Sequence, residues 1–287
     1  MLYRKLKRRI NELTSNVRLN RIATESLYGL ACADYWERTM RSARNAEPKR
    51  LLKHGYRVFS QNDEDGIIAE IFSRIGTTDK TFVEIGVDNG SECNTLNLLA
   101  QGWRGIWFEQ NAAAVAQARR RLTRLLASNR LSIKQINVTR ENIDQLLRDT
   151  ALSLHPDLLS IDVDGNDYWV WRAITSLRPR VVVIEYNAVW RPPASITMKY
   201  NADHAWSEGD VNSGASLSAL EKLGREKGYN LVGCCFAGVN AFFVARELCA
   251  EQFAAPFSSE NHYEPLRAFL LHNPFSRVIG ADDQEPV

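Results

Sequence analysis

Acidic residues and glycines lie together where an apolar segment of the sequence ends. The segment 82–90 (FVEIGVDNG) carries Glu84, Gly86, Asp88 and Gly90. Glycine lets the backbone approach a bound molecule closely, and carboxylates accept hydrogen bonds. The G-x-x-x-G spacing is not the dinucleotide fingerprint, and the sequence has no phosphate-binding lysine motif. This segment taken alone fits a tight strand-to-helix turn equally well.

Polar residues also follow the next three apolar segments. Glu109 closes the second, Asn137 and Val138 follow the third, and Asp162 and Asp164 follow the fourth. Open α/β sheets bind ligands at the carboxyl ends of their strands, so we expect these residues to converge. Glu109 could accept both hydroxyls of a ribose there, with adenine beside residues 137–138. Each position alone is more often a helix cap, but together they predict a nucleoside site.

The elements that must position these residues alternate regularly along the chain. Apolar strand patterns at 81–87, 105–108, 131–136, 158–163 and 181–186 are separated by helical patterns. This alternation predicts a parallel sheet with helices on both faces. Segments 229–235 and 239–245 are joined by three residues ending in glycine, which indicates a β-hairpin. We therefore predict an α/β, Rossmann-like, seven-stranded sheet that is parallel except for a terminal antiparallel hairpin.

The sequence divides into three predicted parts: a basic helical N-terminal extension (1–54), a central domain (55–250) and a C-terminal tail (251–287). Residues 1–53 contain 13 Lys/Arg against 5 Asp/Glu. A basic arm could contact nucleic acid or an anionic membrane surface. We favour a solvated helical extension or a homo-oligomerisation arm, because aromatic residues do not alternate with the basic ones as in nucleic-acid-binding segments.

Composition favours a globular protein outside the membrane. Of the 287 residues, 45% are apolar and 24% charged, and no apolar run reaches the roughly 20 residues of a membrane span. The basic start is followed by no apolar stretch of the signal-peptide kind. Five cysteines without C-x-x-C spacing fit a reducing compartment. We therefore expect a cytoplasmic location.

Taken in order, these motifs resemble the class I S-adenosylmethionine (SAM)-dependent methyltransferases, and in particular their FkbM-like branch. The resemblance covers about residues 57–246 and rests on five features: the loop 84–90, Glu109, the segments 60–65 (SQNDED) and 161–167 (IDVDGND), and the Ile184-Glu185 pair. It implies the seven-stranded methyltransferase fold and SAM as cofactor.

The resemblance also implies roles for individual residues. Glu84, Gly86 and Gly90 would line the methionine and ribose part of SAM, with Gln61 and Asp162 near the methionine end. Glu109 would hold the ribose, and Asn137 and Val138 would flank adenine. Asp88 departs from a more glycine-rich pattern. It would either bind the amino group of the cofactor or cap the following helix.

Methyl transfer to a hydroxyl needs alignment of the reactants and removal of a proton. Asp162, Asp164 and His204 are the candidate bases, although His204 lies in a Trp-rich loop and could be a packing residue. Asp164, Asp167 and Glu185 could hold Mg²⁺, which prefers oxygen ligands, as in similar sugar O-methyltransferases. The alternative is that both aspartates cap the next helix and Glu185 forms a structural pair.

The predicted function is SAM-dependent O-methylation of a hydroxyl on a carbohydrate or natural-product small molecule. Trp190, Tyr200 and Trp206 in the loop 188–213 would either contact that substrate or pin the loop to the sheet. Two alternatives are a SAM-binding, non-catalytic partner in a biosynthetic complex and a nucleic-acid methyltransferase. The chain has no Asn/Asp-Pro-Pro-Tyr motif of the kind used to methylate amino groups in nucleic acids.

Overall fold

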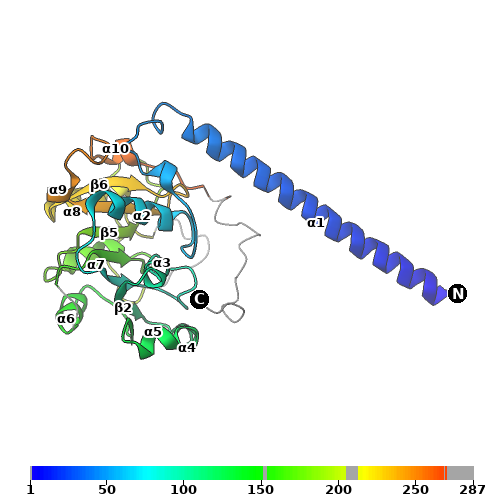
Figure 1. The fold of residues 1–287 in the computed structure, drawn as a ribbon, viewed down its shortest axis with the longest axis horizontal. Coiled ribbons are helices and arrows are strands. Elements are labelled where there is room, and N and C mark those ends of the chain that lie inside the picture. The colour runs from blue at the N-terminus through cyan, green and yellow to red at the C-terminus, as the bar shows by residue number, and fades with distance from the viewer. Residues whose placement is uncertain (1, 151–153, 205–212, 268, 270–287) are drawn as a thin grey trace.

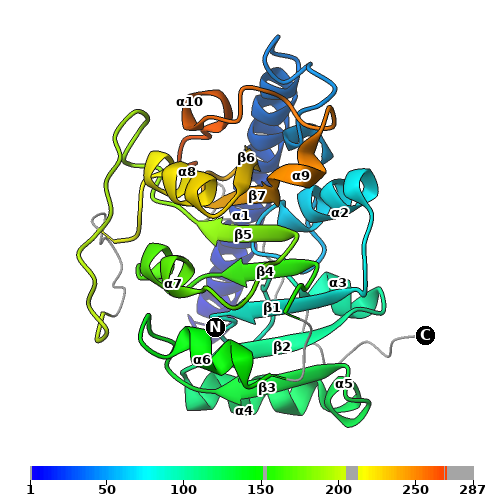
Figure 2. The same ribbon diagram turned by 90° about the vertical axis from the view of Figure 1, so that its left-hand side faces the viewer.

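The computed structural model describes residues 2–150, 154–204, 213–267 and 269, with side chains from residue 14 onward. Its centre is one seven-stranded sheet in the order β3-β2-β1-β4-β5-β7-β6 (Figure 2). The strands are β1 (Thr81–Ile85), β2 (Arg104–Glu109), β3 (Leu131–Gln135), β4 (Leu158–Ile161), β5 (Val181–Glu185), β6 (Tyr229–Cys234) and β7 (Asn240–Ala245).

Strands β1 to β5 pair in parallel, and β7 runs antiparallel to both β5 and β6. The hairpin predicted at 229–245 is therefore present, with β7 inserted between β5 and β6. Val181–Ile184 of β5 are all fully buried, as expected for a central strand covered on both faces. The predicted Rossmann-like fold class is confirmed.

Helices cover both faces of the sheet (Figure 2). One face packs on α2 (Glu64–Ile75), α3 (Leu96–Ala100) and α4 (Ala112–Arg121) through the sheet residues Phe82, Trp107 and Phe242. The other packs on α6 (Ile143–Arg148), α7 (Asp167–Ala173) and α8 (Leu217–Glu226) through Val83, Phe108 and Phe243. The period-2 alternation of strand side chains produces these two cores. Residues 112–127 carry one continuous helical pattern in the sequence, but the helix breaks at Leu122, and α5 (Thr123–Ala127) follows.

The N-terminal helix α1 (Leu2–Met40) projects away from the sheet domain (Figure 1). Its C-terminal end is anchored, because the ring of Tyr35 lies 5.9 Å from that of Phe236 and its hydroxyl accepts a hydrogen bond from Arg267. Arg44 pairs with Glu264 just beyond the helix. The remaining short helices are the 3₁₀ helix η1 (Leu52–His54), α9 (Arg246–Cys249) and α10 (Ser259–His262).

Across the described ranges, no helix combines the length and apolarity that crossing a membrane requires. The described cysteines are all free thiols. The predicted boundary at residue 54 separates segments that contact each other, because Arg74 of α2 donates to the backbone carbonyl of Lys49 at 2.7 Å.

Candidate functional site

A cavity of about 430 Å³ opens at the carboxyl ends of the parallel strands. It is where the strand-end residues were predicted to meet. The predicted residues that line it are Gln61, Glu84, Gly86, Asp88, Glu109, Asn137, Val138, Asp162, Asp164 and His204. Gly90, Asp167 and Glu185 do not line it. The sheet therefore brings residues more than 140 positions apart in sequence into one site.

Gly86 is required by the close approach of β1 to the end of β4. Its φ is +77°, and a Cβ atom there would lie 1.6 Å from the carbonyl oxygen of Asp162. Gly90 has φ +73°, and a Cβ would meet the ring of Trp107 at 2.5 Å. Both glycines therefore serve the turn after β1, but only Gly86 reaches the cavity wall. The turn interpretation therefore applies to both glycines, and the ligand-lining interpretation to Gly86 alone.

Glu84 fixes the loop after β1 from within the core. Its side chain is buried and accepts the backbone N–H groups of Asn94 and Thr95 and the Thr95 hydroxyl. Burial raises the pKa of this carboxyl group, and these hydrogen bonds oppose the shift. Glu84 therefore holds the start of α3 in place and also forms part of the cavity wall.

Glu109, at the end of β2, binds the same loop from the other side. One of its oxygens accepts the N–H groups of Val87 and Asp88, at 3.1 and 2.8 Å, and the other accepts the N–H of Asn111. An ionised carboxylate offers about four acceptor positions, so capacity remains for a ligand hydroxyl. The next strand end supplies Asn137 and Val138 to the same wall.

Gln61 is placed by the acidic residues that follow it. Asp65 accepts the backbone N–H groups of Val58, Phe59 and Ser60, and so folds the segment before α2 into a tight loop. Glu64 accepts the backbone N–H of Asn62 at 2.8 Å. With both neighbours of Gln61 held in this way, the glutamine is presented at the cavity.

Asn240 at the start of β7 also lines the cavity, although the sequence analysis did not identify it. Its side-chain NH₂ donates to Glu64 at 3.0 Å. Since an ionised carboxylate only accepts hydrogen bonds, this contact fixes the orientation of the amide. Its oxygen is then buried without a hydrogen-bond partner among the described residues. An unsatisfied buried acceptor costs about 1–3 kcal/mol, so the site favours a ligand that donates a hydrogen bond here.

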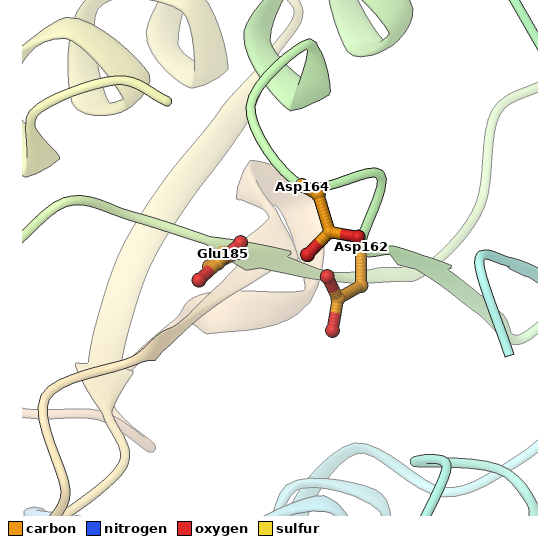
Figure 3. A group of neighbouring side chains, drawn as sticks. All are labelled: Asp162, Asp164 and Glu185. Atoms are coloured by element: carbon orange, nitrogen blue, oxygen red, sulfur yellow. The ribbon is translucent and has the colours of Figure 1, made fainter. Parts of the chain in front are cut away.

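Three carboxylates gather at the ends of β4 and β5. Oxygen atoms of Asp162, Asp164 and Glu185 all lie within 4.8 Å of one another (Figure 3). The predicted metal set contained Asp167 rather than Asp162. The carboxylate of Asp167 instead accepts the backbone N–H groups of Val163 and Gly165, each at 2.9 Å, so it holds the loop before α7 and does not cap that helix as the alternative had it.

Burial and mutual repulsion act together on these acids. Burial raises the pKa of Asp162 well above its usual range, and the charges of Asp167 and Asp164 raise it further. The pKa of Glu185 is raised in the same way, by burial and then by Asp162. Asp167 has a pKa of about 6 because burial outweighs its backbone hydrogen bonds. A bound cation or a donated proton would relieve this repulsion.

His204 reaches the cavity from the loop after β5. Its ring packs over Gly165, where a Cβ atom would lie 2.8 Å from Nε2. That nitrogen is buried and has no hydrogen-bond partner among residues 14–150, 154–204 and 213–267. The ring is also close enough to Asp164 to lower the pKa of that carboxyl group against the effect of burial. His204 and Asp164 therefore form a pair of potential proton acceptors at the cavity wall.

The aromatic residues of this loop behave differently from His204. Tyr200 hydrogen-bonds to Glu141, and its ring stacks 3.8 Å from the guanidinium of Arg140. It therefore pins the loop to the segment after β3, and neither Tyr200 nor Trp190 lines the cavity. Trp206 lies outside the described residues. Beyond the predicted set, polar cavity residues include Asn89, Ser91, Asn94 and Asn166.

The charge of the cavity is strongly one-sided. Its described lining contains six carboxylates, Glu84, Asp88, Glu92, Glu109, Asp162 and Asp164, and no lysine or arginine. Such a site attracts cations and repels anions. Burial raises the pKa of Glu84 and of Asp162, which lowers the charge that these two groups contribute. The acidic lining still disfavours the pyrophosphate of a dinucleotide and favours a nucleoside that carries positive charge.

No protein-family profile matches the chain, and a search among curated proteins gives no match. Solved structures with a similar fold include methyltransferases. One is magnesium protoporphyrin IX methyltransferase from Synechocystis with bound SAM, at 12% identity, TM-score 0.43 and coverage of 64% of this chain and 78% of that one. Another is a SAM-dependent methyltransferase from Clostridium acetobutylicum, at 9% identity, TM-score 0.42 and coverage of 74% and 98%.

A third is an O-methyltransferase from Bacillus cereus in complex with S-adenosylhomocysteine, at 20% identity, TM-score 0.30 and coverage of 42% and 57%. All three TM-scores are below 0.5. These similarities therefore do not indicate what this chain binds or methylates. The sheet of this chain, with its order and its antiparallel β7, has the Rossmann-like methyltransferase fold expected from the sequence.

Proposed function

We propose that this protein is a SAM-dependent methyltransferase that methylates a hydroxyl group on a carbohydrate or natural-product small molecule. The observation that carries the proposal is the convergence of Glu84, Gly86, Glu109 and Asp162 on one cavity that contains six carboxylates and no described lysine or arginine. SAM carries a sulfonium and an ammonium group against one carboxylate, so its net positive charge complements this lining. SAM supplies an activated methyl group when bound.

Different residues along the sheet edge would contact different parts of the cofactor. Asn137 and Val138 flank adenine, and Glu109 accepts one ribose hydroxyl with its remaining acceptor position. Glu84, Asp88 and Gln61 surround the methionine part, on the side of the cavity nearer to Asp162. Strands in a sheet lie about 4.8 Å apart, so β3 to β4 span about 14 Å. That width suits an adenosine with its amino-acid tail.

The hydroxyl substrate would bind beyond β4, where Asn240, His204 and Asp164 line the cavity. The side-chain oxygen of Asn240, which has no partner among the described residues, accepts a hydrogen bond from one substrate hydroxyl. His204, with its unpartnered Nε2, takes the proton of the hydroxyl that is methylated. We prefer His204 to Asp164 as the base, because no described residue forms a hydrogen bond with the buried Nε2 of His204.

A divalent cation would fit beside this position. The carboxylates of Asp162, Asp164 and Glu185 offer the oxygen ligands that Mg²⁺ prefers, and neutralising them would relieve their repulsion. A cation there would polarise a substrate hydroxyl and lower its pKa. In this proposal Asp162 replaces the originally expected Asp167, whose oxygens are already used by backbone N–H groups.

Binding and turnover experiments separate the parts of the proposal. Isothermal titration should detect binding of SAM and S-adenosylhomocysteine, and no binding of NAD. Incubation with methyl-labelled SAM and a panel of sugars should then transfer label to at least one of them. Absence of SAM binding at millimolar concentration would overturn the proposal. Binding without transfer to any hydroxyl compound would favour the non-catalytic alternative.

A further inference from the structure

Helix α1 is far longer than its contact with the domain requires. It comprises 39 residues and leaves the domain as a single projecting rod (Figure 1). Its C-terminal end is held to the domain, through Tyr35 against Phe236 and Arg267. A helical pattern well beyond 25 residues indicates a coiled coil, a membrane span or a helical repeat. The described part of α1 lacks the apolarity of a membrane span.

A regular apolar seam follows the helix at alternating spacings of four and three residues. Its positions are Leu6, Ile10, Leu13, Val17, Asn20, Thr24, Leu27 and Ala31. This is a heptad repeat, in which the first and fourth positions (a and d) form the contact between helices. Six of the eight seam positions are apolar. The repeat extends over nearly four heptads, which is the length at which such a pattern indicates a coiled coil.

The described part of this seam is open to solvent in the single chain. Val17 and Leu27 are each 68% exposed, and Asn20, Thr24 and Ala31 are exposed as well. The seam ends where the helix reaches the domain. The next two positions are Asp34 and Arg38, which pair with each other at 2.8 Å. The apolar stripe is thus confined to the projecting part of α1.

We propose that the partner of this seam is a second copy of the same chain, joined in a parallel two-stranded coiled coil. The a positions hold the β-branched residues Ile10, Val17 and Thr24, and the d positions hold Leu6, Leu13 and Leu27. β-Branched residues at a with leucine at d favour two parallel strands. Asn20 is the single amide in the seam. In a parallel pair it meets Asn20 of the second copy, whereas a shifted register buries it against leucine.

The oligomeric state of the full chain tests this inference. Light scattering coupled to gel filtration should give about twice the 32.6 kDa of one chain. The double substitution Val17→Glu/Leu27→Glu should reduce the mass to that of the monomer. Leu19→Glu/Ile22→Glu is the matched control, because these residues are 60% and 48% exposed but lie off the seam. That control should remain a dimer. Thermal unfolding of the sheet domain should be unchanged in both variants.

A monomeric wild-type chain, or equal effects of the two double variants, would overturn the inference. The direction of pairing is tested by cysteine cross-linking in a Cys32→Ser background. Thr24→Cys, on the seam, should form an intermolecular disulfide on mild oxidation, because parallel in-register helices bring residue 24 next to its own copy. Ser26→Cys, off the seam, should not. Failure of Thr24→Cys to cross-link in a dimer would rule out the parallel arrangement.

Discussion

The carboxylate of Glu109 accepts the backbone N–H of Asp88 at 2.8 Å, and this bond joins the end of β2 to the loop that follows β1. The same oxygen also accepts the N–H of Val87. One acidic side chain therefore shapes the loop and faces the cavity. A substitution at this position should affect the binding of ligand more than the stability of the fold.

We predict that Glu109→Gln weakens SAM binding by about 10- to 100-fold, because hydrogen bonds to a charged group contribute about 1.5–3 kcal/mol. The amide keeps one acceptor oxygen, so the free energy of unfolding should fall by only about 1 kcal/mol. Titration calorimetry with S-adenosylhomocysteine and denaturant unfolding measure the two quantities. Glu92→Gln, at the rim of the same cavity, is the control and should change affinity much less.

Gly86→Ala should destabilise the protein by about 2–6 kcal/mol, because it adds a positive-φ penalty and a clash with the carbonyl oxygen of Asp162. Gly76→Ala is a matched control. Gly76 also has positive φ, +68°, but a Cβ atom there meets nothing within 4 Å. It should cost only the backbone penalty of about 1–3 kcal/mol. Equal losses in denaturant unfolding would show that the close approach at Gly86 is unimportant.

His204→Gln should lower kcat by about 10²- to 10⁴-fold, the usual contribution of a general base. The affinity for S-adenosylhomocysteine should stay within a few-fold of wild type, because His204 lies on the substrate side of the cavity. The two readouts are steady-state turnover on a hydroxyl substrate and calorimetric binding. An unchanged kcat would remove His204 from the mechanism and leave Asp164 as the base.

Chelation with EDTA should abolish methyl transfer, and added Mg²⁺ should restore it. Cofactor binding should change much less than turnover, because two of the three proposed metal ligands, Asp164 and Glu185, are not among the proposed cofactor contacts. Glu185→Gln should raise the Mg²⁺ concentration needed for half-maximal turnover by roughly tenfold or more. Activity that persists in EDTA would exclude the metal and leave the three carboxylates as a proton-sharing cluster.

Asp63 should make the fold less stable as pH rises. It is half-buried, accepts the backbone N–H of Phe236, and has a pKa of about 8 because the loss of solvent around it disfavours its charged form. The unfolded chain releases this proton near pH 4. The stabilisation is therefore complete below pH 4 and is lost as pH approaches 8.

We expect Asp63→Asn to reduce this loss, because the amide retains an acceptor oxygen but has no charge to bury. A one-unit difference in pKa between the folded and unfolded states corresponds to about 1.4 kcal/mol, and the reduction should exceed that. Denaturant unfolding across pH 5 to 9 measures it. Asp203→Asn, on the exposed surface, should leave the pH dependence as in wild type.

The sheet could be predicted from the sequence because its strands are short, apolar and β-branched, as in Val181–Ile184. The positions of Glu84, Glu109 and Asp162 at one edge followed from the parallel arrangement alone. Asn240 could not be found in this way. Its orientation depends on Glu64, which lies 176 positions away and contacts it only in the folded chain.

The sequence analysis expected Asp167 in the carboxylate cluster, whereas the structure has Asp162 there. This difference also depends on contacts that form only in the folded chain. Both residues follow β4 closely, and sequence spacing does not reveal which carboxylate is captured by backbone N–H groups. The loop 161–167 turns so that Val163 and Gly165 both donate to Asp167. The helical break at Leu122 was also not apparent, because the residues on either side continue a helical pattern.

The surplus of negative charge around the cavity also bears on how a reaction cycle would end. Methyl transfer turns the sulfonium into an uncharged thioether, so the cofactor loses a positive charge at the moment it is spent. The electrostatic attraction of the acidic lining for the cofactor then weakens. The cavity wall that binds SAM would thereby favour release of S-adenosylhomocysteine. The difference in affinity between these two molecules should decrease as ionic strength increases.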